Sequence, residues 1–229
     1  MLNMKTILTA SFLTLLSSAT FASSIEDITR GTFVLYADGT SICTTQLVSP
    51  DLLLTANHCV EKPDAKYSIK KVNKNNNGDI ISEEIFYAVP IEQSTNNDTA
   101  ILELFTPFRA PVVDVATDEE ASTLKLGDPV LLFGYPGSTY SPQETLVVTD
   151  GLYTGITNAL VSTITGKFIR TTAGSYYGKS GGGLYAEFDG EWKLIGSNSQ
   201  LNPEMISEFS LATSTEAVNE IIVKASTTK

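Results

Sequence analysis

Short runs of β-branched and aromatic residues, separated by turns, constrain the fold of this chain more than any other feature. The turn dipeptides Asp38-Gly39, Asn77-Gly78, Asp150-Gly151 and Asp189-Gly190 tolerate the positive φ that tight hairpins need. The runs predict strands at 32–36, 42–48, 52–55, 67–72, 80–89, 100–104, 130–133, 144–149, 159–164, 167–172, 183–188, 192–196 and 208–213. Many short strands at close spacing predict an all-β fold, either a sandwich or a barrel.

Two segments depart from this strand pattern. Thr213 stands three residues before Glu216, as in a capping box, and apolar residues follow at near-helical spacing, which predicts a helix over 215–224. The stretch 117–127 is acidic and polar and has few strand formers, so it is the best candidate for a connection between two β halves. At 229 residues, the chain can form one large β domain or two small packed halves.

Composition excludes several classes of function. The 26 acidic residues outnumber the 15 basic ones and give a net charge of -11, which argues against a nucleic-acid partner, because such binding needs clustered cations. With one histidine and two cysteines, the chain has too few nitrogen and sulfur ligands for the usual structural zinc site. We interpret the acidity as an aid to solubility, and it identifies no substrate.

The first 22 residues have the pattern of an export signal. Lys5 supplies the positive start, 7–16 form the apolar stretch, and 20–22 (TFA) form the small-residue exit, which predicts cleavage before Ser23. The alternative is a transmembrane anchor, but the apolar stretch falls short of the ~20 residues that a bilayer span needs. We therefore expect a secreted protein, extracellular or periplasmic, with no membrane span in its mature chain. Export also allows a disulfide to persist.

The segment 54–60 (LTANHCV) contains the only histidine, His58, next to Cys59. Histidine can take and return a proton near neutral pH, so any imidazole chemistry in this chain falls to His58. A lone histidine is, however, more often structural than catalytic.

The segment 178–183 (GKSGGG) sets Ser180 in a glycine-rich turn before a predicted strand. Small neighbours leave backbone amides free to face a ligand, which suits a nucleophile with an oxyanion hole. A flexible surface turn is the alternative. A phosphate-binding loop is rejected, because the spacing is one residue short and a strand follows where that motif requires a helix.

The segment 97–102 (NDTAIL) places Asp98 just before an apolar strand. A carboxylate there could accept a hydrogen bond from the imidazole and fix its tautomer. Alone, Asp98 would be an ordinary aspartate at the start of a strand.

Together these segments resemble the chymotrypsin-like (trypsin-like) serine peptidases. The family motifs T-A-A-H-C, D-I-A-L and G-D-S-G-G correspond to residues 55–59, 98–102 and 178–182, and the order His, Asp, Ser is that of the family. The resemblance covers essentially the whole mature chain. It implies two packed six-stranded antiparallel β-barrels and a C-terminal helix: an N-terminal barrel at 23–120 with His58 and Asp98, and a C-terminal barrel at 121–229 with Ser180. It also implies a disulfide between Cys43 and Cys59.

The resemblance also implies a role for each site residue. His58 would be the general base and then the general acid, Asp98 its orienting partner, and Ser180 the nucleophile that forms the acyl-enzyme. The backbone amides of Gly178 and Ser180 would form the oxyanion hole. Ser199 resembles the family serine that lies under the aspartate and helps to bind the substrate backbone; the alternative is a plain strand residue.

Three features of the chain differ from the animal digestive enzymes. Lys179 replaces the aspartate that pairs with the new N-terminus on zymogen activation, so we expect no activation beyond removal of the signal. Gly174 and Ser175 stand at the floor of the specificity pocket, where no carboxylate is placed to hold a basic side chain. A single disulfide favours a bacterial-type secreted enzyme.

The expected function is therefore that of a secreted serine endopeptidase, a monomer that acts on proteins or peptides without a metal or another cofactor. Two alternatives stay open. An esterase would share the same triad, and a catalytically silent binding protein would share the fold.

Overall fold

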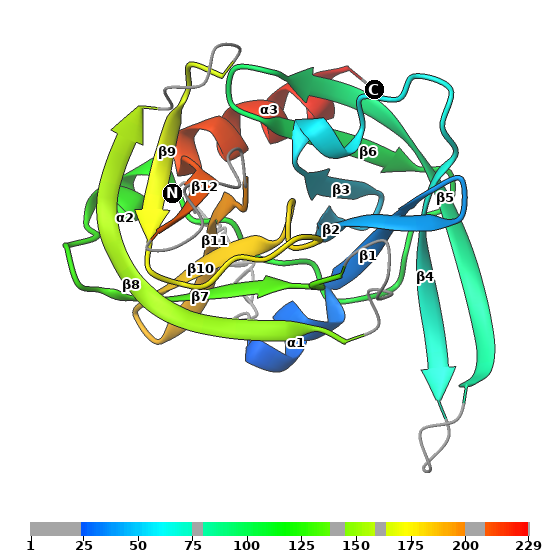
Figure 1. Cartoon of the computed structure of the whole chain (residues 1–229), viewed down its shortest axis with the longest axis horizontal. Coiled ribbons are helices and arrows are strands. Elements are labelled where there is room, and N and C mark those ends of the chain that lie inside the picture. Colours follow the sequence, from blue (N-terminus) through cyan, green and yellow to red (C-terminus); the bar gives the residue numbers. More distant parts are fainter. Residues whose placement is uncertain (1–23, 75–79, 138–144, 159–163, 200–208, 229) are drawn as a thin grey trace, which may run out of the picture.

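The computed structural model describes residues 24–74, 80–137, 145–158, 164–199 and 209–228. The signal expected at 1–22, the Asn77-Gly78 turn and most of the strand expected at 159–164 lie outside these residues. Two β units lie side by side (Figure 1). The first is a closed six-stranded barrel and the second is a six-stranded sheet, so the expected chymotrypsin-like double barrel is confirmed.

The first barrel has the strand order β1-β2-β3-β6-β5-β4. Its strands are β1 (Thr32–Ala37), β2 (Thr40–Ser49), β3 (Leu52–Thr55), β4 (Tyr67–Lys74), β5 (Ile80–Ser94) and β6 (Thr99–Leu104). Phe108 closes the core with edge-on ring contacts to Phe33 and Phe86, at centroid distances of 4.9 and 4.5 Å. β5 is longer than expected because it passes through Pro90 with a shift of register, a place where a strand tolerates a missing N–H.

The second sheet has the order β11-β10-β7-β8-β9-β12. Its strands are β7 (Pro129–Gly134), β8 (Val147–Asn158), β9 (Lys167–Thr171), β10 (Gly183–Phe188), β11 (Glu191–Ser197) and β12 (Ser210–Thr213). A bridge between Asn198 and Ala212 brings its two ends together. In sequence, these strands all follow Asp128, and those of the first barrel all precede Phe105.

Asp150-Gly151 is not a turn, and this prediction was wrong. Both residues lie inside β8, opposite Leu131 and Val130 of β7. Gly151 is needed there for close packing, because a Cβ at this position would lie 2.2 Å from the Ala173 nitrogen. By contrast, Asp38-Gly39 and Asp189-Gly190 do have positive φ, as the turn prediction required.

Three α-helices accompany the described strands. They are α1 (Ile25–Arg30), α2 (Asp118–Ser122) and α3 (Thr215–Thr227). α3 begins where expected, but its N-cap is Ser214, whose side chain accepts from the Ala217 N–H; Thr213 belongs to β12. The expected connection at 117–127 contains α2, which Thr117 and Glu120 cap reciprocally. None of the helices within the described ranges is long and apolar enough to cross a bilayer.

A buried apolar cluster joins the two β units. Leu54 and Ile101 come from the first barrel, Phe133 and Tyr185 from the second sheet, and Ile221 from α3. Ile28 of α1 is also buried there. Because both β units and two helices share this cluster, their relative position is set by apolar packing.

Candidate active site

Strand pairing brings His58 and Asp98 together. β3 pairs with β6 so that Thr55 lies opposite Ala100. The chain then turns into a short 3-10 helix, η1 (Asn57–Cys59), which presents His58 beside the residue that precedes β6. Residues 40 positions apart therefore become neighbours through the register of two buried strands.

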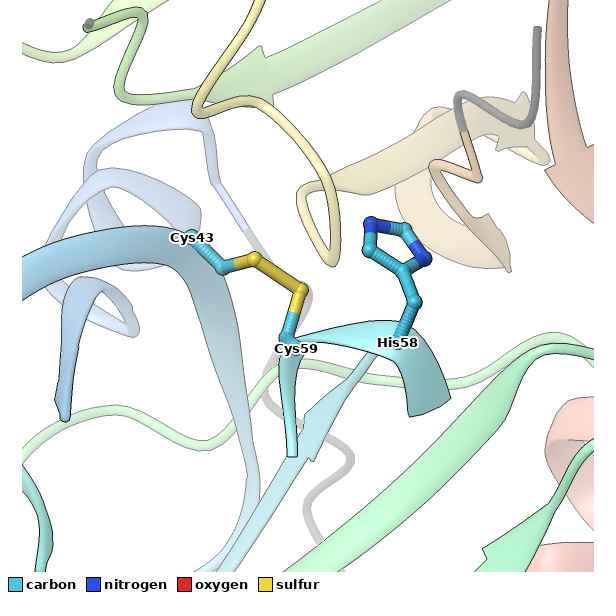
Figure 2. Close-up of side chains that lie close together, drawn as sticks. All are labelled: Cys43, His58 and Cys59. Carbon is cyan, nitrogen blue, oxygen red and sulfur yellow. A yellow bond between two sulfur atoms is a disulfide. The ribbon is translucent and has the colours of Figure 1, made fainter. Parts of the chain in front are cut away.

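The Cys43–Cys59 disulfide is present and fastens η1 to β2. Figure 2 shows it next to the imidazole of His58. The two sulfur atoms and a ring nitrogen of His58 all lie within 4.8 Å of one another, a spacing that would suit a metal ion. Because the sulfurs are bonded to each other, neither is a thiolate that could act as a ligand.

Asp98 holds both the backbone and the ring of His58. Its carboxylate lies 2.9 and 3.1 Å from Nδ1 and accepts the His58 backbone N–H at 3.0 Å. Ser199 donates a further hydrogen bond to this carboxylate from its hydroxyl. With Nδ1 engaged, the far nitrogen Nε2 is left to exchange protons.

The pKa of His58 is raised above its usual 6.5. Burial lowers it, but the hydrogen bond and negative charge of Asp98 outweigh burial, and Glu61 adds a smaller attraction. The ring is therefore a stronger base than a free imidazole, as a general base requires.

Ser180 stands in a loop that two glycines with positive φ shape, Gly178 at 88° and Gly181 at 78°. A Cβ on Gly181 would lie 2.2 Å from the carbonyl oxygen of Thr44, so the sequence needs glycine after the serine. Thr44 of β2 also fastens this loop to the first barrel: its N–H donates to the Ser180 carbonyl at 2.8 Å and its hydroxyl to the Gly178 carbonyl at 2.9 Å.

The backbone amides of Gly178 and Ser180 donate to no other group in the described part of the chain. Unpaired amides on either side of one residue can receive a developing oxyanion. His58, Gly178 and Ser180 line one cavity of about 430 Å³. The residues that carry the base, the hydroxyl and the two unpaired N–H groups thus line one cavity.

The other predicted site residues lie around this centre. Ser199 contacts Asp98, as described above. Ser175 is buried and accepts from the Asn198 amide at 2.8 Å, and the Gly174 carbonyl accepts from Thr149 of β8. Neither Gly174 nor Ser175 lines the 430 Å³ cavity.

The sequence did not indicate half of the residues that line the cavity, nor the hydrogen bonds by which Thr44 holds the serine loop. Ala37, Ile42, Glu61, Lys62 and Tyr177 line the cavity besides the residues discussed above. Glu61 and Lys62 follow the His58-Cys59 pair, so their proximity in sequence could have indicated them. Thr44 had no comparable signal, because only the packing of the two β units brings it to the serine loop.

The family model Trypsin matches residues 25–222. A comparison with curated proteins found no match. Among solved structures, the chain is similar to the HtrA-type protease AlgW with tripeptide, with a TM-score of 0.67 and 21% identity over 86% of this chain and 60% of that one. It is similar to the Rv3671c protease from M. tuberculosis in its active form, with a TM-score of 0.68 and 16% identity over 88% and 83% of the two chains.

A serine endoprotease from Yersinia pestis is also similar, with a TM-score of 0.63 and 21% identity over 88% of this chain and 64% of that one. At these identities the structural likeness concerns the fold. The chain spans about three-fifths of the length of the AlgW chain.

Proposed function

This chain belongs to the trypsin family, and we propose that it is a serine endopeptidase whose catalytic triad is Ser180, His58 and Asp98. The observation that carries this proposal is the Asp98–His58 pair, joined at 2.9 Å, with His58 lining the same cavity as Ser180. Ser199 supports the pair from beneath through its bond to Asp98.

The reaction follows from these positions. Ser180 Oγ attacks the carbonyl carbon of the scissile peptide bond, and its proton passes to Nε2 of His58. The amides of Gly178 and Ser180 bind the oxygen that becomes negative. His58 then returns the proton to the leaving nitrogen, so the C–N bond breaks and an acyl ester remains on Ser180. Water, deprotonated by His58, cleaves that ester and restores the hydroxyl.

A fluorophosphonate probe tests this assignment directly, because it attaches covalently only to an activated serine. We expect one adduct on Ser180 in the folded protein and none in Ser180→Ala. Ser122→Ala, which changes a serine of α2, should label like the wild type. A folded wild-type protein without an adduct would instead support the silent binding protein.

Peptide and ester substrates of matched sequence separate the endopeptidase from the esterase. We expect hydrolysis of both, with internal peptide bonds cleaved. Ester hydrolysis without any peptide cleavage would favour the esterase.

We further propose that the protein is exported, with residues 1–22 as the signal and Ser23 as the mature start. A disulfide and the lack of a membrane-spanning helix in the described ranges are compatible with this. Ser24 caps α1, and Ile28 is fully buried in the cluster between the β units, so a start after Arg30 would remove core packing. N-terminal sequencing of the active secreted form should read from Ser23; a start beyond Arg30 would refute this.

A further inference from the structure

Lys179, which stands between Gly178 and the nucleophile, has no exposed surface. Lysine is almost never fully buried unless an opposite charge pairs with it. None of the ion pairs among the described residues includes Lys179. Its burial therefore costs free energy and calls for a functional reason.

The ammonium of Lys179 closes a small ring of neutral groups. Nζ donates to the Thr149 hydroxyl at 3.1 Å and to the Gly174 carbonyl at 3.3 Å. Thr149 in turn donates to the same Gly174 carbonyl at 2.9 Å. The side chain thus ties the start of the serine loop, at Gly174, and strand β8 to the residue just before Ser180.

The backbone of Lys179 is held equally well. Its N–H donates to the Tyr176 carbonyl at 3.0 Å, and its carbonyl accepts from the Gly182 N–H at 2.8 Å and from the Asn198 amide at 3.0 Å. Gly134 of β7 leaves room for the stem, because a Cβ there would lie 2.9 Å from Lys179 Cγ. A residue fixed at both its backbone and its side-chain end also fixes the two peptide groups that flank it. The Ser180 N–H lies in one of these groups, and the Gly178 N–H lies in the peptide group just before the other.

We propose that Lys179 is a positioning residue: its buried side chain holds the Gly178 and Ser180 amides in the orientation that acylation of Ser180 requires. This inference rests on the proposed triad. We call the hydrogen-bonded group of Lys179, Thr149 and the Gly174 carbonyl the clamp. It lies within the serine loop and β8, so the orientation of the two amides depends on no ion pair with a newly freed N-terminus.

The charge state of Lys179 gives this clamp a pH limit. Burial lowers its pKa from 10.5 to about 8, so the ammonium is lost as the pH rises through that value. Tyr176, with its ring centroid 5.8 Å from Nζ, is the titratable group that faces it among the described residues. The other groups around it are neutral: Thr149 on β8, Gly134 on β7 and the Gly174 carbonyl.

Lys179→Met tests the clamp, because methionine keeps an unbranched stem and removes the three donors. We expect fluorophosphonate labelling of Ser180 to slow by about tenfold or more, up to the roughly 10²–10³-fold loss that follows removal of an oxyanion-hole donor. The melting temperature should hold or rise, because a buried unpaired charge is removed while Thr149 still donates to Gly174. Lys125→Met, at an exposed lysine, is the matched control and should change neither quantity.

Lys179→Arg separates positioning from mere support of the fold. Arginine stays charged at every accessible pH. The labelling rate of the wild type should fall above about pH 8, because Lys179 loses its charge there. The arginine variant should keep its neutral-pH rate to higher pH. The methionine variant should show no such decline at alkaline pH.

The outcomes distinguish this inference from the proposed triad. If the probe labels the wild type and Lys179→Met at the same rate, the clamp is refuted and the proposed triad is unaffected. The same holds if Lys179→Met has a lower melting temperature but an unchanged labelling rate. If the wild type itself does not label, both fail. If Lys179→Met does not fold, Thr149→Val decides: a slower rate, restored in Thr149→Ser, supports the clamp, and an unchanged rate overturns it.

Discussion

Asp98 combines a strained backbone with a carboxylate that accepts hydrogen bonds from two residues. Its φ is 49°, a left-handed conformation that costs energy for most residues other than glycine, and less for aspartate, whose short polar side chain can form hydrogen bonds nearby. Its carboxylate accepts from the backbone N–H and ring of His58 and from Ser199, and it is only 1% exposed. The strain is offset by bonds that all serve to orient one imidazole.

Asp98→Asn should lower kcat by about four orders of magnitude, because a neutral amide favours the wrong histidine tautomer and no longer stabilises the imidazolium. Circular dichroism should show a folded protein. Asp118→Asn, on α2, is the matched control and should retain full activity. A loss of less than tenfold in Asp98→Asn would contradict the triad.

We expect the protonation of His58 to set the fall of activity at low pH. The ring must be neutral to accept the serine proton, so activity should rise with pH through a pKa that lies above 6.5. Glu61→Gln removes one of the charges that raise this pKa and should move the acid limb toward lower pH. Glu119→Gln should leave the limb in place. An acid limb that moves upward in Glu61→Gln would contradict this electrostatic account.

At the scale of elements, most strands could be predicted from the sequence, because apolar and polar residues alternate along them or the whole run between two turns is apolar. The predictions were wrong where a residue is required by a contact with a segment that is distant in sequence. Gly151 is glycine because β8 passes close to Ala173, and a dipeptide pattern cannot distinguish that reason from a turn. Thr213 fits a capping box, yet its hydroxyl accepts from the Ser197 N–H instead.

Gly151→Ala should destabilise the protein by roughly 1–3 kcal/mol, because the added methyl group would meet backbone 2.2 Å away. Gly174→Ala provides the comparison, since its Cβ would lie 3.5 Å from the nearest atom, an ordinary contact. Urea unfolding should show a lower midpoint for the first variant only. Equal midpoints would mean that β8 is not closely packed at Gly151.

Ser214→Ala should cost about 1 kcal/mol of unfolding free energy, because it removes the N-cap of α3. Ser226→Ala, near the other end of the same helix, is the control. If Ser214→Ala unfolds like the wild type, the helix does not depend on this cap.

At the scale of the whole molecule, the motifs were sufficient to predict the double barrel and the residues now proposed as the triad. They could not reveal the Thr44 tether or the Lys179 clamp, because both depend on the packing of segments that are far apart in sequence. Thr44 reaches Gly178 across 134 positions.

The disulfide contributes at this scale as well. Replacing both Cys43 and Cys59 by alanine opens a link that spans 16 positions and should lower the unfolding free energy by about 3 kcal/mol. Chemical denaturation of the variant and of the reduced wild type should agree. A stability equal to that of the oxidised wild type would show that the core alone holds η1 against β2.

The division of the site between the two β units sets when activity can arise during synthesis. His58 and Asp98 belong to the unit that leaves the ribosome first, and Ser180 belongs to the second. α3, which follows both units in the chain, packs on β5 and β6 of one and on β11 of the other. With the triad as proposed, a growing chain therefore carries the base and its carboxylate without the nucleophile until the second unit has been made.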